Sequence, residues 1–154
     1  MQDATLCFPV TDGEILLIKK KRGIGEGLYN GPGGKVEGGE TPREAARREV
    51  REEIRADVSE LAKLGELAFE MAGDPFMFVH VYRSPGVIGE PAETPEARPE
   101  WFDVEEIPYD EMWPDDRYWL PQLLEGHTFE GTFRFGESEH DLQDWELETA
   151  VDLG

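Results

Sequence analysis

The chain has 154 residues, 38% of them hydrophobic, which predicts one domain over residues 1–154 with a single core. Its 35 acidic and 15 basic residues give a net charge of −20, so we expect no binding to nucleic acid polymers. The absence of a long apolar run and of a basic, apolar leader predicts no membrane contact and a cytoplasmic location.

The acids are spread along the whole chain, and Arg outnumbers Lys by 10 to 5. Such a surface predicts a halophilic protein, whose acidic groups are screened by ions at high salt. Ordinary acidic solubility is the alternative, and a salt titration of unfolding distinguishes the two.

Two apolar-rich runs, residues 5–10 and 14–20, flank the Thr11-Asp12-Gly13 turn and predict a β-hairpin. The only dense positive cluster, residues 19–22, precedes a glycine-rich loop over residues 23–34. On so acidic a protein, positive charge beside this loop favours an anion subsite. A basic strand edge that resists pairing is the alternative.

The next element is a helix that we expect to begin at Thr41. Thr41 is a good N-cap, Pro42 suits the first helical position, and Glu44 completes a capping box. An apolar stripe at helical spacing then predicts one buried face.

Three carboxylates, those of Glu49, Glu52 and Glu53, fall within an arc of about 100° beside that face. Acids this close raise one another's pKa unless a cation joins them. The hard, oxygen-seeking Mg²⁺ is the simplest partner, with Mn²⁺ as an alternative. Arg48 precedes Glu52 by four residues and is expected to bond to it. A solvated acidic helix face is the competing interpretation.

After this helix the predicted elements are strands at 64–71 and 76–82 joined by a turn at 73–75, a surface loop over 83–100, a helix from about Asp115 to Leu124, and a hairpin of strands 128–135 and 142–151. Strands around one metal-bearing helix, with a second helix, predict an α/β (α+β) fold in which helices flank a mixed β-sheet.

A sequence motif covers the glycine turn and the acidic helix. The pattern G-x5-E-x7-R-E-U-x-E-E-x-G-U, with U a bulky apolar residue, is matched at Gly34, Glu40, Arg48, Glu49, Val50, Glu52 and Glu53. The segment resembles the Nudix box, the signature of hydrolases that cleave nucleoside diphosphates linked to another group. Arg55 stands where that family has Gly, and Ala56 where it usually has a larger aliphatic residue.

The resemblance implies a Nudix-type α/β/α sandwich and a metal-dependent hydrolase. The residues it implies as metal ligands are Gly33, Glu49, Glu52, Glu53 and Glu96. We hypothesise attack of water on a phosphorus of a nucleoside triphosphate, releasing the monophosphate and pyrophosphate. The base is either Glu53 or Glu96, and the sequence does not choose between them. Arg48 is expected to orient the carboxylates.

Within that family, nearly the whole chain is similar to the animal-type oxidised-purine nucleoside triphosphatases, which hydrolyse 8-oxo-dGTP and 2-oxo-dATP. The likeness includes the segments Lys20-Lys21-Arg22-Gly23, Tyr29-Asn30-Gly31 and Trp113-Pro114-Asp115-Asp116. It implies substrate-binding roles for Asn30, Trp113, Asp115, Asp116, Thr5, Lys20, Phe69 and Trp119. Ile24 departs from the group, which has an aromatic residue there.

Two adjacent carboxylates, those of Asp115 and Asp116, can accept from the N–H groups of a purine edge, and a protonated one can also donate. Shifting that proton would let one pocket accept both oxidised guanine and oxidised adenine. The alternative is that Asp115 caps the following helix and Trp113 belongs to the core.

We therefore expect a monomeric enzyme whose partner is a nucleoside triphosphate and that sanitises the nucleotide pool. Two alternatives stay open. A Nudix hydrolase with this fold could act on another nucleoside diphosphate derivative, or the domain could be a nucleotide-binding sensor without catalysis.

Overall fold

The computed structural model describes residues 1–153. Its strands are β1 (Gln2–Thr11), β2 (Glu14–Lys20), β3 (Tyr29–Asn30), β4 (Asp57–Val58), β5 (Ala62–Met71), β6 (Asp74–Ser84), β7 (Val87–Ile88), β8 (Ala97–Asp103), β9 (Phe129–Phe135) and β10 (Leu142–Thr149). The helices are α1 (Pro42–Ile54), the short 3-10 helix η1 (Tyr109–Glu111) and α2 (Asp116–Leu124). None of these helices is long and apolar enough to cross a membrane.

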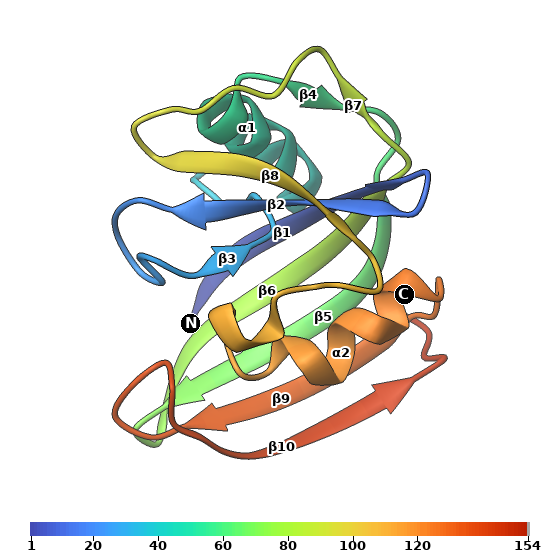
Figure 1. Ribbon diagram of the computed structural model, residues 1–154. Coiled ribbons are helices and arrows are strands. Elements are labelled where there is room, and N and C mark those ends of the chain that lie inside the picture. Colours follow the sequence, from blue (N-terminus) through green and yellow to red (C-terminus); the bar gives the residue numbers. More distant parts are fainter. Residues whose placement is uncertain (154) are drawn as a thin grey trace.

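The main sheet is mixed, as the sequence predicts. Within residues 1–153 it has eight strands in the order β10-β9-β5-β6-β1-β2-β3, with β8 added beside β2 (Figure 1). Strand β1 is parallel to β6 and β5 is parallel to β9, while the other pairs are antiparallel. The short strands β4 and β7 pair separately.

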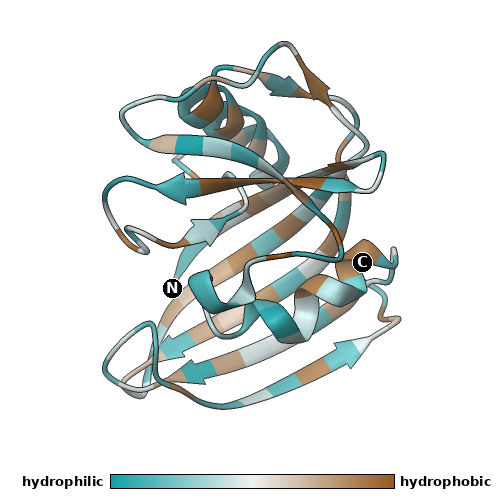
Figure 2. Cartoon of the chain, in the orientation of Figure 1, coloured by the Kyte–Doolittle hydropathy of each residue, from teal (hydrophilic) through white to brown (hydrophobic). Residues whose placement is uncertain are grey.

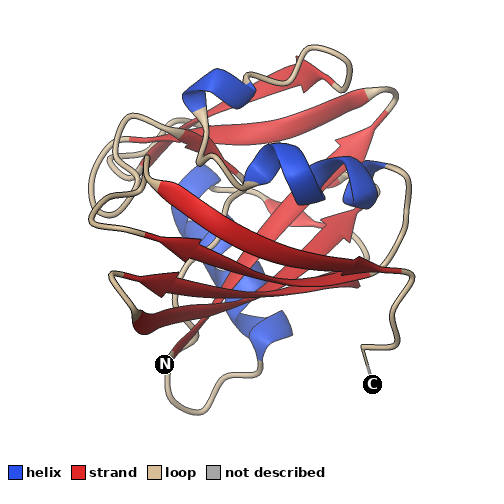
Figure 3. Ribbon diagram, turned by 90° about the horizontal axis from the view of Figure 1, so that it is seen from below, coloured by secondary structure: helices blue, strands red, loops and turns tan. Residues whose placement is uncertain are grey.

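The two helices pack on opposite faces, which gives the predicted α/β/α layering. Along β2, Leu16 and Ile18 join the core cluster beneath α1, whereas Ile15 and Leu17 join the cluster beneath α2. Because alternate residues of a strand point to opposite faces, a strand buried on both sides must be apolar throughout. Figure 2 shows β2 as such a continuous apolar run, and Figure 3 shows α2 lying along one side of the strands.

Two tight turns set the register of the first two hairpins. Asp12 and Gly13 have φ of 50° and 78°, and Ala72 and Gly73 have φ of 51° and 86°. Two left-handed residues in succession match the right-handed twist of the flanking strands. The predicted first hairpin is confirmed. The second turn lies at residues 72–73, one residue before the predicted position, so that β6 begins at Asp74.

The predicted surface loop over residues 83–100 is wrong at both ends. Strand β6 extends to Ser84, and β8 begins at Ala97 and pairs with β2 along its whole length. The proline content of this segment suggested a loop, but Pro99 is tolerated because β8 is an edge strand that, among residues 1–153, pairs with β2 alone.

A split in the sheet creates the space for a site. Strand β1 pairs with β2 only at Val10 and Thr11, and farther along β2 pairs with β3 instead. The loop after β3 occupies the freed edge of β1, where the Thr5 and Cys7 N–H groups donate to the carbonyls of Gly34 and Pro32, both at 2.8 Å. This glycine-containing loop is thereby held between β1 and α1.

Candidate active site

One cavity of about 760 Å³ draws residues from both helices, β1, β5, β6 and the glycine-rich loop. That volume is in the range of pockets that hold small-molecule ligands. Its acidic side chains form two groups. We call Glu49, Glu52, Glu53 and Glu96 the glutamate end, and Asp115 and Asp116 the aspartate end.

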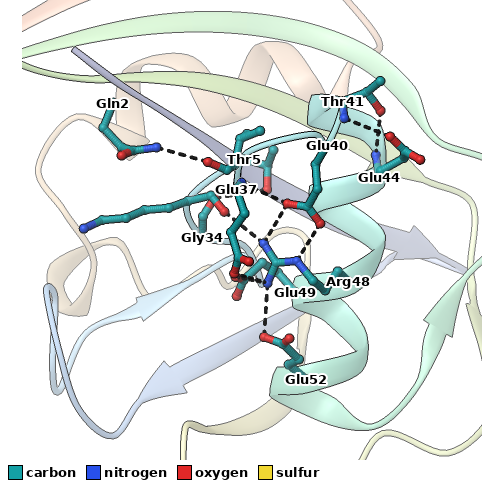
Figure 4. Close-up of polar contacts among 12 residues, drawn as sticks. Gln2, Thr5, Gly34, Glu37, Glu40, Thr41, Glu44, Arg48, Glu49 and Glu52 are labelled. Carbon is teal, nitrogen blue, oxygen red and sulfur yellow. Dashed lines mark hydrogen bonds and ion pairs between the residues drawn. The ribbon is translucent and has the colours of Figure 1, made fainter.

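The helix that carries three of the glutamates begins as the sequence predicts. The Thr41 hydroxyl accepts from the Glu44 N–H at 3.1 Å, and the Glu44 carboxylate accepts from the Thr41 N–H at 2.9 Å (Figure 4). The helix ends at Arg55, which adopts a left-handed conformation with φ of 55°. The chain therefore makes a left-handed exit turn without the glycine that such a cap favours.

Glu53 is the most buried member of the glutamate end, with 3% of its surface exposed. Its Oε1 accepts from the Gly33 N–H at 2.7 Å. Burial raises the pKa of Glu53 to about 8, against the lowering effects of this hydrogen bond and of Lys20. Gly33 is required here because a Cβ would lie 1.9 Å from the Thr5 carbonyl oxygen.

Arg48 binds Glu49 and Glu52, the other two glutamates that α1 contributes to the glutamate end (Figure 4). Its guanidinium donates to Glu40 at 2.6 and 3.0 Å, to Glu49 at 2.8 Å and to Glu52 at 3.2 Å. The predicted contact with Glu52 is confirmed, although Glu40 is the stronger partner. Burial raises the pKa of Glu49, and Arg48 opposes that shift.

Glu96 reaches the cavity from the segment before β8, far from α1 in sequence. The Arg22 Nε donates to its carboxylate at 3.0 Å, and a second guanidinium nitrogen also contacts it. The hydrogen bond to Arg22 lowers the pKa of Glu96. The structure thus brings Glu96 to the same cavity as the α1 glutamates, and the sequence did not indicate its arginine partner.

The glutamate end has donors that suit a hard divalent cation, because every candidate ligand is an oxygen. The Gly34 backbone also approaches this end so closely that a Cβ would lie 2.6 Å from the Glu49 carboxyl carbon. Within residues 1–153 no three acidic, His or Cys side chains converge on one ion position as they stand. Arg48 holds Glu49 and Glu52, and Arg22 holds Glu96, so these side chains would have to turn to take an ion.

The aspartate end is buried, and no cationic partner is among the groups that set its pKa values. Asp115 and Asp116 are each 2% exposed, and the Trp119 indole N–H donates to Asp115 Oδ2 at 2.7 Å. Burial raises the pKa of both carboxyls, and that of Asp116 rises further because Asp115 is adjacent. Both shifts favour a proton on this pair of carboxyls.

Two buried oxygens at this end, Asp115 Oδ1 and Asp116 Oδ2, have no hydrogen-bond partner within residues 1–153. Buried polar atoms are rarely left unpaired, and because both residues line the cavity, a water or a ligand there can supply the missing partners. Asp115 does occupy the N-cap position of α2, as the alternative has it, but its side chain makes no capping hydrogen bond. That carboxylate is turned toward Trp119 and the cavity instead.

Most of the predicted base-pocket residues line the cavity. Thr5, Lys20, Asn30, Phe69 and Trp113 all belong to its wall. The Asn30 side-chain oxygen accepts from the Gly31 N–H at 2.8 Å, which fixes the direction of its amide. Trp113 also packs edge-on against a core phenylalanine, so it belongs to both core and cavity.

The prediction for Trp119 needs correction. Trp119 is fully buried between Phe8 and Phe129 and does not line the cavity. It contacts Asp115 from one turn farther along α2, because residues four apart lie on the same side of a helix, and its ring extends from there into the core. Its role is to hold Asp115 in place.

Sequence reasoning missed the apolar part of the cavity wall, formed by Met71, Phe76, Met77 and Phe135. Strand alternation could have indicated some of these residues, because Met71 is two residues from Phe69 and therefore points to the same face. Nothing local indicated Phe135, which reaches the cavity only through the pairing of β9 with β5.

Comparisons with known proteins agree with this geometry. Residues 1–123 match the family model described as NUDIX domain. A Danio rerio protein named oxidized purine nucleoside triphosphate hydrolase is 47% identical over 139 residues, covering 90% of this chain and 88% of that protein. A Mus musculus protein of the same name is 43% identical over 136 residues, covering 88% and 87%. The crystal structure of a Bacillus halodurans mutator MutT protein superposes with a TM-score of 0.85 at 25% identity, covering 96% of this chain and 98% of that chain.

Proposed function

Because the chain belongs to the NUDIX family, we propose that it hydrolyses oxidised purine nucleoside triphosphates, such as 8-oxo-dGTP and 2-oxo-dATP, to the monophosphate and pyrophosphate. One observation carries the proposal: a single cavity contains both groups of acids. The glutamate end suits a metal ion and phosphate, and the buried aspartate end suits the edge of a purine. Neither end alone would select this substrate.

At the glutamate end, Glu49, Glu52, Glu53, Glu96 and the Gly33 carbonyl would hold Mg²⁺, or Mn²⁺ in its place. The bound ion supplies charge neutralisation for the phosphates and the displaced group. Lys20 adds a fixed positive charge on the cavity wall. Arg48 keeps Glu49 and Glu52 oriented while they exchange partners.

The proton removed from the attacking water is best assigned to Glu53. In the metal-free protein, burial raises the pKa of Glu53 to about 8, whereas the hydrogen bond from Arg22 lowers the pKa of Glu96. Of these two carboxylates, Glu53 is therefore the one whose protein surroundings favour taking up a proton. Glu96 is then a carboxylate that stays ionised.

At the aspartate end, a proton shared by Asp115 and Asp116 would allow the pair to recognise the purine base. Asp115 accepts from a purine N–H, and protonated Asp116 donates to a ring nitrogen or carbonyl. The proton can lie on either carboxyl, so one site serves oxidised guanine and oxidised adenine, whose donors and acceptors are arranged differently. Asn30 contributes an amide and Trp113 a flat aromatic face.

A turnover comparison tests the proposal. Pyrophosphate release is measured for 8-oxo-dGTP, 2-oxo-dATP, unmodified dGTP and a nucleotide sugar, with Mg²⁺, at low and high KCl. We expect both oxidised nucleotides to have a higher kcat/KM than dGTP. Equal hydrolysis of dGTP, or preference for the nucleotide sugar, would favour a different Nudix substrate. Tight binding without turnover of any compound would indicate a sensor.

A further inference from the structure

Thr94 joins the two segments that carry the glutamate end. It lies between β7 and β8, is 5% exposed, and its hydroxyl donates to the backbone carbonyl of Glu53 at 2.8 Å. The same oxygen accepts from the N–H groups of Glu96 at 3.2 Å and Ala97 at 3.3 Å. One buried side chain is therefore bonded to the backbones of Glu53 and Glu96.

The segment around Thr94 docks on the carboxyl end of α1. The last carbonyls of a helix have no partner within it and need outside donors. The Thr94 hydroxyl supplies one for Glu53, and the Ala92 N–H supplies another for Ile54 at 2.8 Å. The Thr94 N–H also donates to the Ala97 carbonyl at 2.9 Å, which closes the turn around Pro95.

This docking fixes the backbone position from which the Glu96 side chain extends. Its side chain is held by Arg22 in an ion pair whose two side chains are 61% and 41% exposed, and exposed pairs contribute little. The backbone of Glu96 is fixed more firmly, by Thr94 on one side and by the Lys21 N–H, which donates to its carbonyl at 3.0 Å, on the other. Of these two contacts, the one through Thr94 fixes the position of Glu96 relative to α1, because Thr94 is also bonded to Glu53.

We propose that Thr94 is a positioning residue that sets Glu96 against Glu49 and Glu53 so that the three carboxylates can share a divalent ion. The proposal rests on the proposed function, because it assumes that these carboxylates bind a metal. Partners that orient metal ligands typically change metal affinity by about 10- to 100-fold when they are removed. Thr94 does so by fixing a backbone rather than by touching the carboxylate.

The test is Mn²⁺ binding alone, measured by the paramagnetic resonance of free Mn²⁺ at constant ionic strength. Thr94→Val keeps the shape and removes the hydroxyl, and we expect it to weaken Mn²⁺ binding by about 10-fold. Thr94→Ser restores the hydroxyl and should bind as the wild type does. In a Glu96→Gln background, Thr94→Val should have no further effect, because the carboxylate it positions is gone.

A matched control separates positioning from folding. Ser84 is another fully buried hydroxyl that organises a turn, donating to the Gly86 carbonyl at 2.8 Å, and it lies outside the cavity. Ser84→Ala should lower the melting temperature without changing Mn²⁺ affinity. Should Thr94→Val not fold, Pro95→Gly, at an exposed position, loosens the same turn and is expected to weaken Mn²⁺ binding in its place.

Unchanged Mn²⁺ affinity in Thr94→Val, or in Pro95→Gly where that variant replaces it, would overturn the proposal. A full Thr94→Val effect in the Glu96→Gln background would overturn it as well, because Thr94 would then act through Glu53 or the fold. If the wild type binds no Mn²⁺ and hydrolyses no nucleotide, the proposed function fails with it. A wild type that binds and hydrolyses, beside variants that do the same, rejects only the role of Thr94.

Discussion

The two ends of the cavity contain buried acids in opposite surroundings. At the glutamate end, Glu49 and Glu53 have raised pKa values, yet Arg48 and Lys20 lie close enough to lower them. At the aspartate end, Asp115 and Asp116 are both 2% exposed, and no cation is among the groups that shift their pKa values. The Trp119 indole N–H lowers the pKa of Asp115, whereas the adjacent Asp115 raises that of Asp116. Acids that already have cations nearby can exchange an arginine or lysine partner for a metal ion. Acids without a nearby cation favour holding a proton instead.

Under the proposed function, that difference would separate the chemistry at the glutamate end from recognition of the base at the aspartate end. Charge must be neutralised where phosphate is cleaved, and hydrogen bonds to a neutral base must be formed in a dry site where each one counts. Variants at the two ends should therefore fail in different ways.

Glu53→Gln should have the greatest effect and should be confined to the glutamate end. The amide has no negative charge to hold an ion tightly and cannot accept a proton from water, so we expect kcat to fall by about 10²- to 10⁴-fold. Binding of the oxidised nucleotide, measured by calorimetry, should stay near the wild-type value because the aspartate end is untouched. Near-normal turnover would remove Glu53 from the mechanism.

Asp116→Asn should show the opposite pattern. The amide cannot shift a proton to or from Asp115, so kcat/KM for the oxidised nucleotides should fall by about 10- to 100-fold, mainly through KM. Steady-state kinetics with 8-oxo-dGTP and 2-oxo-dATP measure the loss, and Mn²⁺ affinity serves as the control. Loss of Mn²⁺ binding in this variant would mean that the two ends are not separate.

The pH dependence of stability should reveal the cost of the buried Glu53. Its pKa is about 8 in the folded protein, against an ordinary value of 4.5, so the unfolded chain releases the proton first. Stability from protonated Glu53 is complete below pH 4.5 and is lost as the pH rises toward 8. Without metal, the free energy of unfolding of Glu53→Gln should therefore be about 2 kcal/mol higher than that of the wild type near pH 8. At acid pH the two proteins should be equally stable.

Urea unfolding across that pH range measures the difference. Glu52→Gln is the matched control, since the Glu52 side chain is 57% exposed and its removal should change stability little at any pH. An equal gain in both variants would point to general relief of negative charge rather than to burial.

Arg55→Gly should have the smallest effect and should leave both ends unchanged. Arg55 occupies the left-handed position at the end of α1, a conformation that costs a residue with a side chain about 1 kcal/mol more than glycine. Thermal unfolding should show a gain of that size. Arg55→Ala keeps the strain and removes the charge, so a similar gain there would contradict a conformational origin.

The sequence was most informative where local rules decide the structure. The capping box at Thr41, the Asp12-Gly13 turn and the spacing of Glu49, Glu52 and Glu53 predicted the helix, the first hairpin and the glutamate end. The site residues on distant segments, Glu96 and Asp116, came from a family resemblance and not from spacing. The single domain and the monomeric state stay predictions.

What the sequence could not indicate depended on long-range contacts. Strand β8 was hidden by Pro99 because edge position is a property of the assembled sheet. The burial of Glu53 follows from the loop that β1 holds over it, and Trp119 faces the core because of the way α2 packs. The halophilic surface also stays a prediction, and unfolding at low and high KCl tests it: equal stability at both would remove it.

The most direct test of the two-ended cavity is a crystal structure of the wild type with Mn²⁺ and a non-hydrolysable analogue of 8-oxo-dGTP. We predict anomalous density among Glu49, Glu53 and Glu96, Arg22 released from Glu96, and the purine edge within hydrogen-bond distance of Asp115 and Asp116. Phosphates bound away from the glutamates, or a purine outside the aspartate pair, would contradict it.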